Sequence, residues 1–211
     1  MVAHGLPGVF IVVEGPHGSG KSTLAASLAV ELESLGTMVN HSKEPYVQDF
    51  LPLIRSFSME PQQGVVLAAL IAADRYLHVT DIKKHLQEGH CVISDRYVPS
   101  SLVYQGMQGI QRRRLLEWND FALDPDVTFF IRTPVEQRVP RLSSRMDSDH
   151  FLKMKQIVHE QTLYEEIVSD SELSGKFSIH TLDGQAPAAQ VLQQALSALK
   201  ANPRSRRCLL G

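Results

Sequence analysis

Residues 9–23 read VFIVVEGPHGSGKST, and this stretch decides the fold. Its first five residues are apolar and mostly β-branched, which is typical of a strand buried on both faces of a parallel sheet. Gly15 to Ser22 then match the pattern G-x-x-x-x-G-K-[ST] at every position. A helical pattern follows and ends at Gly36. Strand, glycine-rich loop and helix in this order predict a phosphate-binding loop.

The spacing within this loop suits the phosphates of a nucleotide. Glycines allow successive backbone N–H groups to turn toward phosphate oxygens, and the start of the helix adds its positive end. Lys21 would reach the β- and γ-phosphates, and the Ser22 hydroxyl would ligate Mg²⁺. The sequence therefore predicts ATP or GTP, bound with Mg²⁺ by Gly15, Pro16, His17, Gly18, Ser19, Gly20, Lys21, Ser22 and Thr23.

The rest of the chain alternates between strand and helix patterns. Further strands are predicted at 37–42, 90–94, 127–131 and 177–182, and helices at 22–35, 63–86, 115–123, 151–168 and 188–199. This alternation indicates βαβ units with helices on both faces of a parallel sheet. We predict an α/β fold: a three-layer α/β/α P-loop NTPase fold with a five-stranded parallel sheet. The helix at 63–86 has an apolar stripe that includes Leu67, Leu70, Ile71 and Leu77.

Length and composition fit one folded domain. The chain has 211 residues, of which 43% are hydrophobic and 21% charged, so a disordered, collagen-like or coiled-coil chain is excluded. We predict a single domain over residues 1–203 with a short lid at about 141–150, and a disordered basic tail at 204–211. The net charge of −2 gives no reason to expect nucleic acid or an anionic membrane as a partner.

Two cysteines, Cys91 and Cys208, offer no disulfide framework. No segment has the pattern of a signal peptide or a membrane span, so we expect a cytoplasmic protein. Cys208 lies four residues from the end, as in a prenylation motif, but Gly211 is not a usual last residue for that motif. We expect a frayed tail there, and a modification of Cys208 stays open.

Two further residues bear on the phosphate acceptor. Asp95 follows the third predicted strand, so its carboxylate should lie at the carboxyl edge of the sheet, beside the phosphate loop. It would hold Mg²⁺ there, or form a simple structural ion pair. Arg75 lies within an apolar helix, where its side chain would either extend to solvent or bind an anion with its planar guanidinium.

Several motifs together resemble the thymidylate kinase family of P-loop nucleoside monophosphate kinases. They are the loop from Glu14 to Thr23, Lys43-Glu44-Pro45, Ala72-Ala73-Asp74-Arg75, Asp95-Arg96-Tyr97 with Ser100-Ser101 and Tyr104-Gln105-Gly106, and Asn119 with the segment 125–130. The resemblance runs from about residue 9 to residue 183. It implies strand order 2-3-1-4-5, a homodimer packed through helices, and transfer of the ATP γ-phosphoryl group to dTMP to give dTDP.

The resemblance also implies roles for single residues. Arg75 and Arg96 should bind the 5′-phosphate of the acceptor, and Asp95 should organise Mg²⁺ and the transferred group. The other implied acceptor residues are Glu44 and Pro45 in a loop where a cis proline is usual, Ile71, Ser101 and Gln105 at the base, and Tyr104 under a deoxyribose.

A catalytic arginine comes from either the phosphate loop or the lid in this family. The loop here has no arginine, so the lid arrangement is implied. The expected catalytic residues are Lys21, Asp95, Arg96, Arg141 and Arg145, with Arg138 next in line.

Three positions depart from the family pattern. His17 stands where an acidic residue often contacts the sugar 3′-hydroxyl, Ile71 stands where a phenylalanine stacks on thymine, and Arg132 follows the fourth strand in place of an acid. The first two bear on acceptor recognition, because base stacking contributes about 1–3 kcal/mol. Two alternatives therefore stay open: a kinase for a different or modified nucleotide-like monophosphate, and an ATP-binding sensor or regulatory protein with little turnover.

Overall fold

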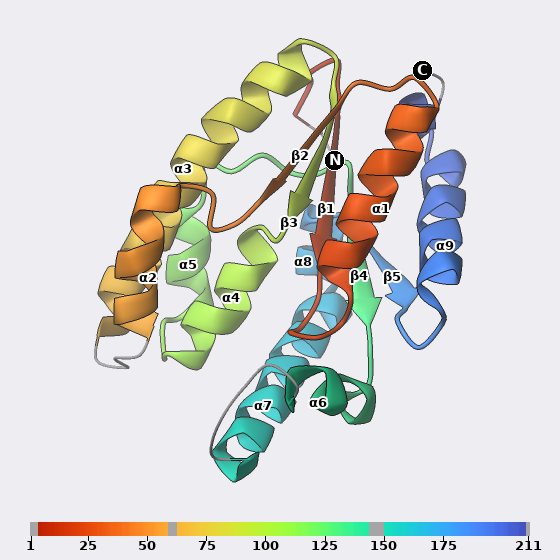
Figure 1. Cartoon of the computed structure of the whole chain (residues 1–211). Helices are drawn as coiled ribbons and strands as arrows, with labels where there is room; N and C mark the ends of the chain where they lie inside the picture. The colour runs from red at the N-terminus through yellow and green to blue at the C-terminus, as the bar shows by residue number, and fades with distance from the viewer. Residues whose placement is uncertain (1–3, 59–62, 144–149, 210–211) are drawn as a thin grey trace.

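Five parallel strands form one sheet at the centre of the molecule (Figure 1). The computed structural model describes residues 4–58, 63–143 and 150–209. The strands lie in the order β2-β3-β1-β4-β5, which confirms both the predicted fold class and the strand order. Their bounds are β1 Val9–Glu14, β2 Val39–Lys43, β3 Cys91–Asp95, β4 Val127–Arg132 and β5 Ile179–Asp183.

Strand β1 occupies the middle of the sheet because its residues can be buried on both faces. All six are buried, and β1 pairs with β3 on one side and β4 on the other. Phe10 and Val12 point toward one face, while Val9, Ile11 and Val13 point toward the other. The outer strands β2 and β5 contain more polar residues and are partly exposed.

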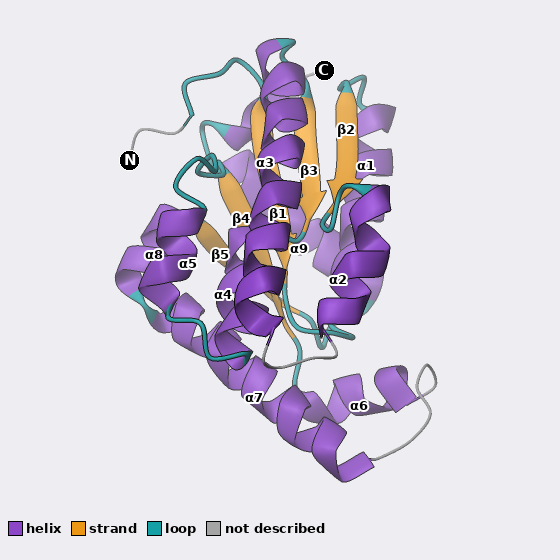
Figure 2. Ribbon diagram, turned by 90° about the vertical axis from the view of Figure 1, so that its left-hand side faces the viewer, coloured by secondary structure: helices purple, strands orange, loops and turns teal. Residues whose placement is uncertain are grey.

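Helices cover both faces of this sheet, as Figure 2 shows. Helices α1 and α9 pack on one face, and α3, α4, α5, α7 and α8 contribute to the apolar cluster on the other. The helices are α1 Lys21–Ser34, α2 Leu51–Ser58, α3 Gly64–Gln87, α4 Val98–Met107, α5 Arg112–Trp118, α6 Val135–Ser143, α7 His150–Ser169, α8 Ser171–Lys176 and α9 Ala188–Ala201, with 3₁₀ turns η1 Gln48–Phe50 and η3 Ser205–Leu209. No helix in the described ranges has the length and hydropathy needed to cross a membrane.

The sequence missed four short helices: α2, α4, α6 and α8. Each has ten residues or fewer, too few turns for a clear apolar period. Helix α5 begins at Arg112, earlier than the predicted helix at 115–123, and ends at Trp118. Its C-cap, Asn119, has φ −117° and ψ 21°, which is no longer helical. Of the predicted lid at 141–150, residues 141–143 belong to α6, position 150 begins α7, and 144–149 lie outside the described residues.

Helix α3 buries only part of its predicted apolar stripe. Leu67 is 3% exposed, whereas Leu77 is 47% exposed, so the prediction for Leu77 is wrong. Val66 and Tyr76 are exposed beside it, at 50% and 58%. Residues 66 and 77 are 11 positions apart, which is about three helical turns and places them on one side of the helix, with Tyr76 next to Leu77. The exposed side of α3 is therefore unusually apolar.

The C-terminal segment differs from the predicted disordered tail. Residues 205–209 form η3, in which Ser205 and Cys208 are buried. The Thr37 hydroxyl donates to the Cys208 carbonyl at 2.5 Å, and Arg204 forms an ion pair with the buried Asp126. Because a 3₁₀ helix has three residues per turn, the small residues at 205 and 208 face the core while the arginines between them face outward. The basic composition of the segment predicts an exposed tail and gives no indication that residues 205 and 208 are buried.

Deletion of residues 204–211 tests whether η3 belongs to the fold. It should lower the free energy of unfolding by about 2–4 kcal/mol, because it exposes the apolar contacts of Cys208 and removes the cation paired with Asp126. Urea denaturation measures the change, and deletion of residues 210–211 alone is the control. An unchanged midpoint with the longer deletion would show that the tail is disordered in solution.

Candidate active site

The phosphate loop lies between the end of β1 and the start of α1, as the sequence predicted. Gly18 has a φ of 78°, and a Cβ there would meet Leu142 at 3.3 Å and the Arg138 carbonyl at 3.4 Å. The side chain of Lys21 is buried, and its Nζ donates to the Pro16 carbonyl at 3.3 Å. Burial, together with the nearby Arg96 cation, lowers the pKa of Lys21 to about 7. The loop thus provides a buried amine beside a turn of backbone N–H groups.

Ser22 and Asp95 form the oxygen-rich corner of the site. Ser22 Oγ donates to Asp95 Oδ2 at 2.5 Å, and Lys43 Nζ lies 3.8 Å from the same oxygen. Asp95 Oδ1 is buried and has no hydrogen-bond partner among the described residues. Hydroxyl and carboxylate oxygens are the ligands that Mg²⁺ prefers. These two residues therefore fit the Mg²⁺ that accompanies ATP.

Arg75 is buried inside the site and does not extend to solvent. It is 1% exposed, so the alternative of a solvent-directed side chain is wrong. Its Nε and Nη2 donate to the Glu44 carboxylate at 2.6–3.1 Å, and Nη1 donates to Asn119 Oδ1 at 2.6 Å. Burial would raise the pKa of Glu44, but the Arg75 cation and the contact with His78 together outweigh burial, and the pKa is lowered. The Glu44–Pro45 peptide bond is cis, as the resemblance implied.

The segment after β3 brings a second arginine to the same edge of the sheet. Arg96 has a φ of 81°, and its Nη1 donates to Ser100 Oγ at 3.1 Å and to Tyr104 Oη at 2.9 Å. Its guanidinium lies over the Tyr104 ring, 4.9 Å from the ring centre. The side chains of Arg96 and Tyr104 therefore fix each other's position through a hydrogen bond and a cation–π contact.

Two buried polar side chains on α4 can form hydrogen bonds with a ligand. Ser101 and Gln105 lie one helical turn apart and are both buried. Ser101 Oγ and Gln105 Oε1 lack a hydrogen-bond partner in the part of the chain that the structure describes. Buried polar groups are normally paired, so these two atoms suit a polar ligand. Ile71 is partly buried on α3, one turn before Arg75.

Glu14 organises the site in a way that the sequence did not predict. Its carboxylate is 1% exposed and accepts from the backbone N–H groups of Tyr97 at 2.8 Å and Ser100 at 3.0 Å. The hydroxyls of Ser100 and Tyr164 donate to its second oxygen at 2.9 and 3.0 Å. Burial raises the pKa of Glu14. One carboxylate thus connects β1 to the start of α4 and to α7.

A second unpredicted carboxylate, Glu160 on α7, faces the phosphate loop. Its Oε1 lies 2.7 Å from His17 Nδ1 and accepts from the Tyr104 hydroxyl at 2.6 Å. Burial would raise the pKa of Glu160, but the hydrogen bonds from His17 and Tyr104 outweigh it and lower the pKa to about 2. Burial lowers the pKa of His17, and the Arg96 cation lowers it further. His17 and the ionised Glu160 therefore form a hydrogen-bonded pair.

Glu160 could not be found from the sequence because no local motif surrounds it. It lies 143 residues from His17 along the chain, and the two meet only when α7 packs beside the loop. Glu14 did appear in the family motif, but its hydrogen-bond partners on α4 and α7 could not be inferred from spacing alone.

The arginines in and near the predicted lid occupy two different environments. Arg138 is fully buried, donates to Glu160 Oε2 at 2.8 Å, and also donates to the His17 carbonyl at 3.0 Å. Arg141 is exposed, and its Nη1 donates to the Gly18 carbonyl at 3.1 Å. Arg145 lies outside the described residues. Arg138 and Arg141 therefore both contact the phosphate loop, and Arg138 is also paired with the buried Glu160.

Comparison with known proteins agrees with this geometry. The sequence model of the thymidylate kinase family matches residues 13–195. A probable thymidylate kinase of Thermococcus kodakarensis is 40% identical over 157 residues, which cover 69% of this chain and 77% of the relative. A thymidylate kinase of Xanthomonas oryzae pv. oryzae is 36% identical over 191 residues, which cover 89% of this chain and 81% of the relative. The chain therefore belongs to the thymidylate kinase family.

Proposed function

We propose that this chain transfers the γ-phosphoryl group of ATP to dTMP, which gives ADP and dTDP. The observation that carries the proposal is the meeting of two anion sites at one edge of the sheet. The phosphate loop with Lys21 lies at the end of β1, and Arg96 follows β3 directly beside it. Arg75 reaches the same region through its hydrogen bond to the Tyr97 carbonyl at 3.2 Å. Two phosphate-bearing substrates can therefore bind side by side.

The donor side depends on Lys21, Ser22 and Asp95. The negative charge of ATP favours the protonated form of Lys21, whose pKa is about 7 in the free protein. Ser22 and Asp95 would hold Mg²⁺ through their side-chain oxygens. When bound, Mg²⁺ supplies positive charge to the phosphate oxygens. The remaining loop residues from Gly15 to Thr23 would surround the phosphates with backbone N–H groups.

The acceptor side depends on residues from α3 and α4. Asn119 engages one of the two Arg75 Nη1 hydrogens, and the other would donate to the acceptor phosphate. Arg96 would donate to the same phosphate. Ser101 and Gln105 would bind the edge of the base through their unpaired polar atoms. A strong general base is unnecessary, because the attacking phosphate oxygen is already an anion.

The sugar would lie between Tyr104 and His17. Tyr104 would fill the space that a 2′-hydroxyl needs, which favours a deoxyribose. His17 is hydrogen-bonded to the ionised Glu160, and its side chain is 57% exposed. We propose that this His17–Glu160 pair binds the 3′-hydroxyl. The carboxylate at this position would then come from α7, whereas in other members of the family it often comes from the phosphate loop.

A panel of acceptors tests the proposed reaction. ADP release should be measured with dTMP, dUMP, dCMP, UMP and a 3′-deoxy analogue of dTMP. We expect the highest kcat/KM with dTMP, a value about 5–150-fold lower with dUMP because it lacks a methyl worth roughly 1–3 kcal/mol, and a still lower value with UMP. Arg75→Lys, which keeps a cation beside Glu44, should raise the KM for dTMP much more than the KM for ATP.

Two results of this assay would overturn the proposal. Preference for an acceptor other than dTMP would indicate a kinase of different specificity. ATP binding without turnover of any of the five acceptors would favour a sensor or regulatory protein.

We further propose that two copies of the chain form a homodimer through the exposed apolar side of α3. Val66, Tyr76 and Leu77 on this side are 47–58% exposed in a helix that otherwise covers the sheet. Val66→Glu should place a charge in the contact and reduce the mass in solution from twice 23.5 kDa to one chain. Val30→Glu is the matched control, because Val30 is an exposed valine of α1 on the opposite face of the sheet. A single-chain mass for the unaltered protein would contradict the dimer.

Substitution of Arg138 and of Arg141 should separate an effect on catalysis from an effect on stability. We propose that Arg141 neutralises charge on the transferred group, so Arg141→Ala should lower kcat about 10²–10³-fold with little change in the free energy of unfolding. Arg138→Ala should instead lower the free energy of unfolding by about 3–5 kcal/mol, because it leaves Glu160 buried without its cation. Steady-state kinetics and urea denaturation on both variants measure these effects. An unchanged kcat in Arg141→Ala would move the proposed role to Arg145.

A further inference from the structure

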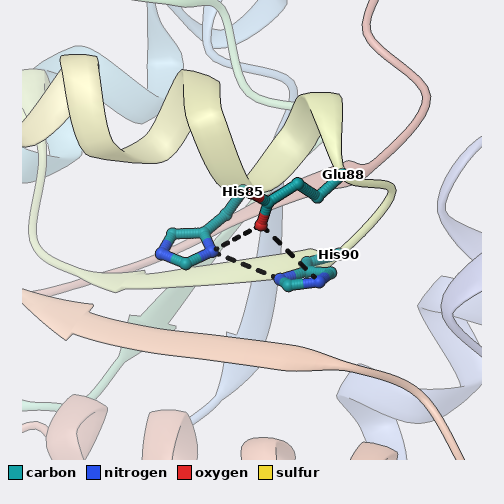
Figure 3. Close-up of side chains that lie close together, drawn as sticks. All are labelled: His85, Glu88 and His90. Carbon is teal, nitrogen blue, oxygen red and sulfur yellow. Dashed lines mark hydrogen bonds and ion pairs between the residues drawn. The ribbon is translucent and has the colours of Figure 1, made fainter.

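Three metal-ligating side chains meet at the end of α3, away from the active site (Figure 3). His85 and Glu88 lie at the C-terminal end of α3, and His90 directly precedes β3. The phosphate loop and Asp95 lie at the opposite, carboxyl end of the strands. The five residues of β3 separate the two places by about 15 Å. We infer that His85, Glu88 and His90 form a binding site for a divalent transition-metal ion of the Zn²⁺ class.

The distances between the ligand atoms are close to those of a coordinated ion. His85 Nδ1 lies 3.2 Å from His90 Nδ1 and 3.5 Å from Glu88 Oε2, while Glu88 Oε2 lies 3.9 Å from the other ring nitrogen of His90, Nε2. One ligand atom from each residue can be chosen so that all three lie within 4.8 Å of one another. Zinc–nitrogen bonds of about 2.0–2.1 Å at tetrahedral angles place neighbouring ligand atoms roughly 3.3 Å apart. The rings of His85 and His90 are stacked, with an interplanar angle of 24° and centroids 5.3 Å apart. Because the lone pair of an imidazole nitrogen lies in the plane of its ring, one ring must turn for both nitrogens to bind the same ion.

The backbone holds the three residues in a compact turn. The Glu88 N–H donates to the Lys84 carbonyl at 3.1 Å, and the His90 N–H donates to the His85 carbonyl at 3.0 Å. Gly89 between them has a φ of 83°, which allows the chain to leave the helix and enter β3 at once. The ligands are thus brought together by main-chain hydrogen bonds that do not depend on an ion.

Asp81 supports the inference from the preceding helical turn. Its Oδ1 lies 3.6 Å from His85 Nε2, on the side of the ring away from His90. A carboxylate there favours the tautomer with hydrogen on Nε2, which leaves the lone pair of Nδ1 for a metal. The C-terminal end of α3 also carries partial negative charge, which favours a bound cation. Lys84 in the same turn is exposed and opposes this charge.

The ligand types select the class of metal. Two imidazoles and one carboxylate suit Zn²⁺, Ni²⁺ or Cu²⁺, whereas Mg²⁺ prefers oxygen ligands throughout. His85 and His90 are each 22% exposed and Glu88 is 46% exposed, so solvent reaches the cluster and water can complete the coordination. The site would fasten the end of α3, which carries Arg75, to the start of β3. This inference does not rest on the proposed kinase reaction.

Titration of the untagged protein with Zn²⁺ alone, without nucleotide, tests the site. Calorimetry should show one equivalent bound per chain, and a hundredfold excess over the dissociation constant should raise the Tm by about 5 °C. His85→Ala and His90→Ala should each weaken binding at least tenfold. His159→Ala is the matched control, because His159 is an exposed histidine on α7 and its loss should leave the affinity unchanged.

Glu88→Gln keeps the shape of the turn and tests the site even if a histidine variant fails to fold. It should weaken Zn²⁺ binding severalfold, since an amide is a poorer ligand than a carboxylate. Co²⁺ in place of Zn²⁺ should give the visible absorption of a protein-bound ion, and this absorption should be lost in His85→Ala. The absence of saturable binding, or equal affinity in the unaltered protein and in the three variants of the site, would overturn the inference.

Discussion

The buried carboxylate of Glu14 is the contact on which the arrangement of the site depends. It lies at the last residue of β1, immediately before the phosphate loop, and accepts hydrogen bonds from α4 and from Tyr164 of α7. A buried charge is stable only when such donors surround it, so the three elements must pack together for Glu14 to be accommodated. The loop, the start of α4 and α7 therefore take fixed positions relative to one another.

The same principle governs the cations of the site. Arg75 is held by Glu44, and Arg138 is held by Glu160, with both pairs almost completely buried. A cluster of cations without these carboxylates would repel itself and would be costly to bury. The carboxylates keep the free protein folded with the guanidiniums in place. Two phosphate-bearing substrates can then be met by positive charge that is already oriented, which is the main requirement of phosphoryl transfer.

Glu160 also changes how we interpret His17, which stands where the family often has an acidic residue. In the sequence, a histidine in place of an acid suggests that a carboxylate is missing from the loop. In the structure, α7 supplies a carboxylate 2.7 Å from that histidine, and the Tyr104 hydroxyl binds the same oxygen. The three side chains form one hydrogen-bonded unit at the proposed sugar site. No hydrogen bond or ring contact among the described residues offers a comparable replacement at Ile71, so we expect acceptor recognition to differ from the family pattern mainly at the face of the base.

The sequence by itself determined the parallel sheet and the phosphate loop, because both depend on local patterns: apolar runs in five segments and fixed spacing between Gly15 and Ser22. Tertiary structure decided which distant side chains meet. Glu160 reaches His17 across 143 residues, and Cys208 packs against Cys91 across 117. The choice between an exposed and a buried Arg75 also depended on Glu44, which folding places beside it. Such contacts follow from helix packing and buried charge, and no spacing along the chain records them.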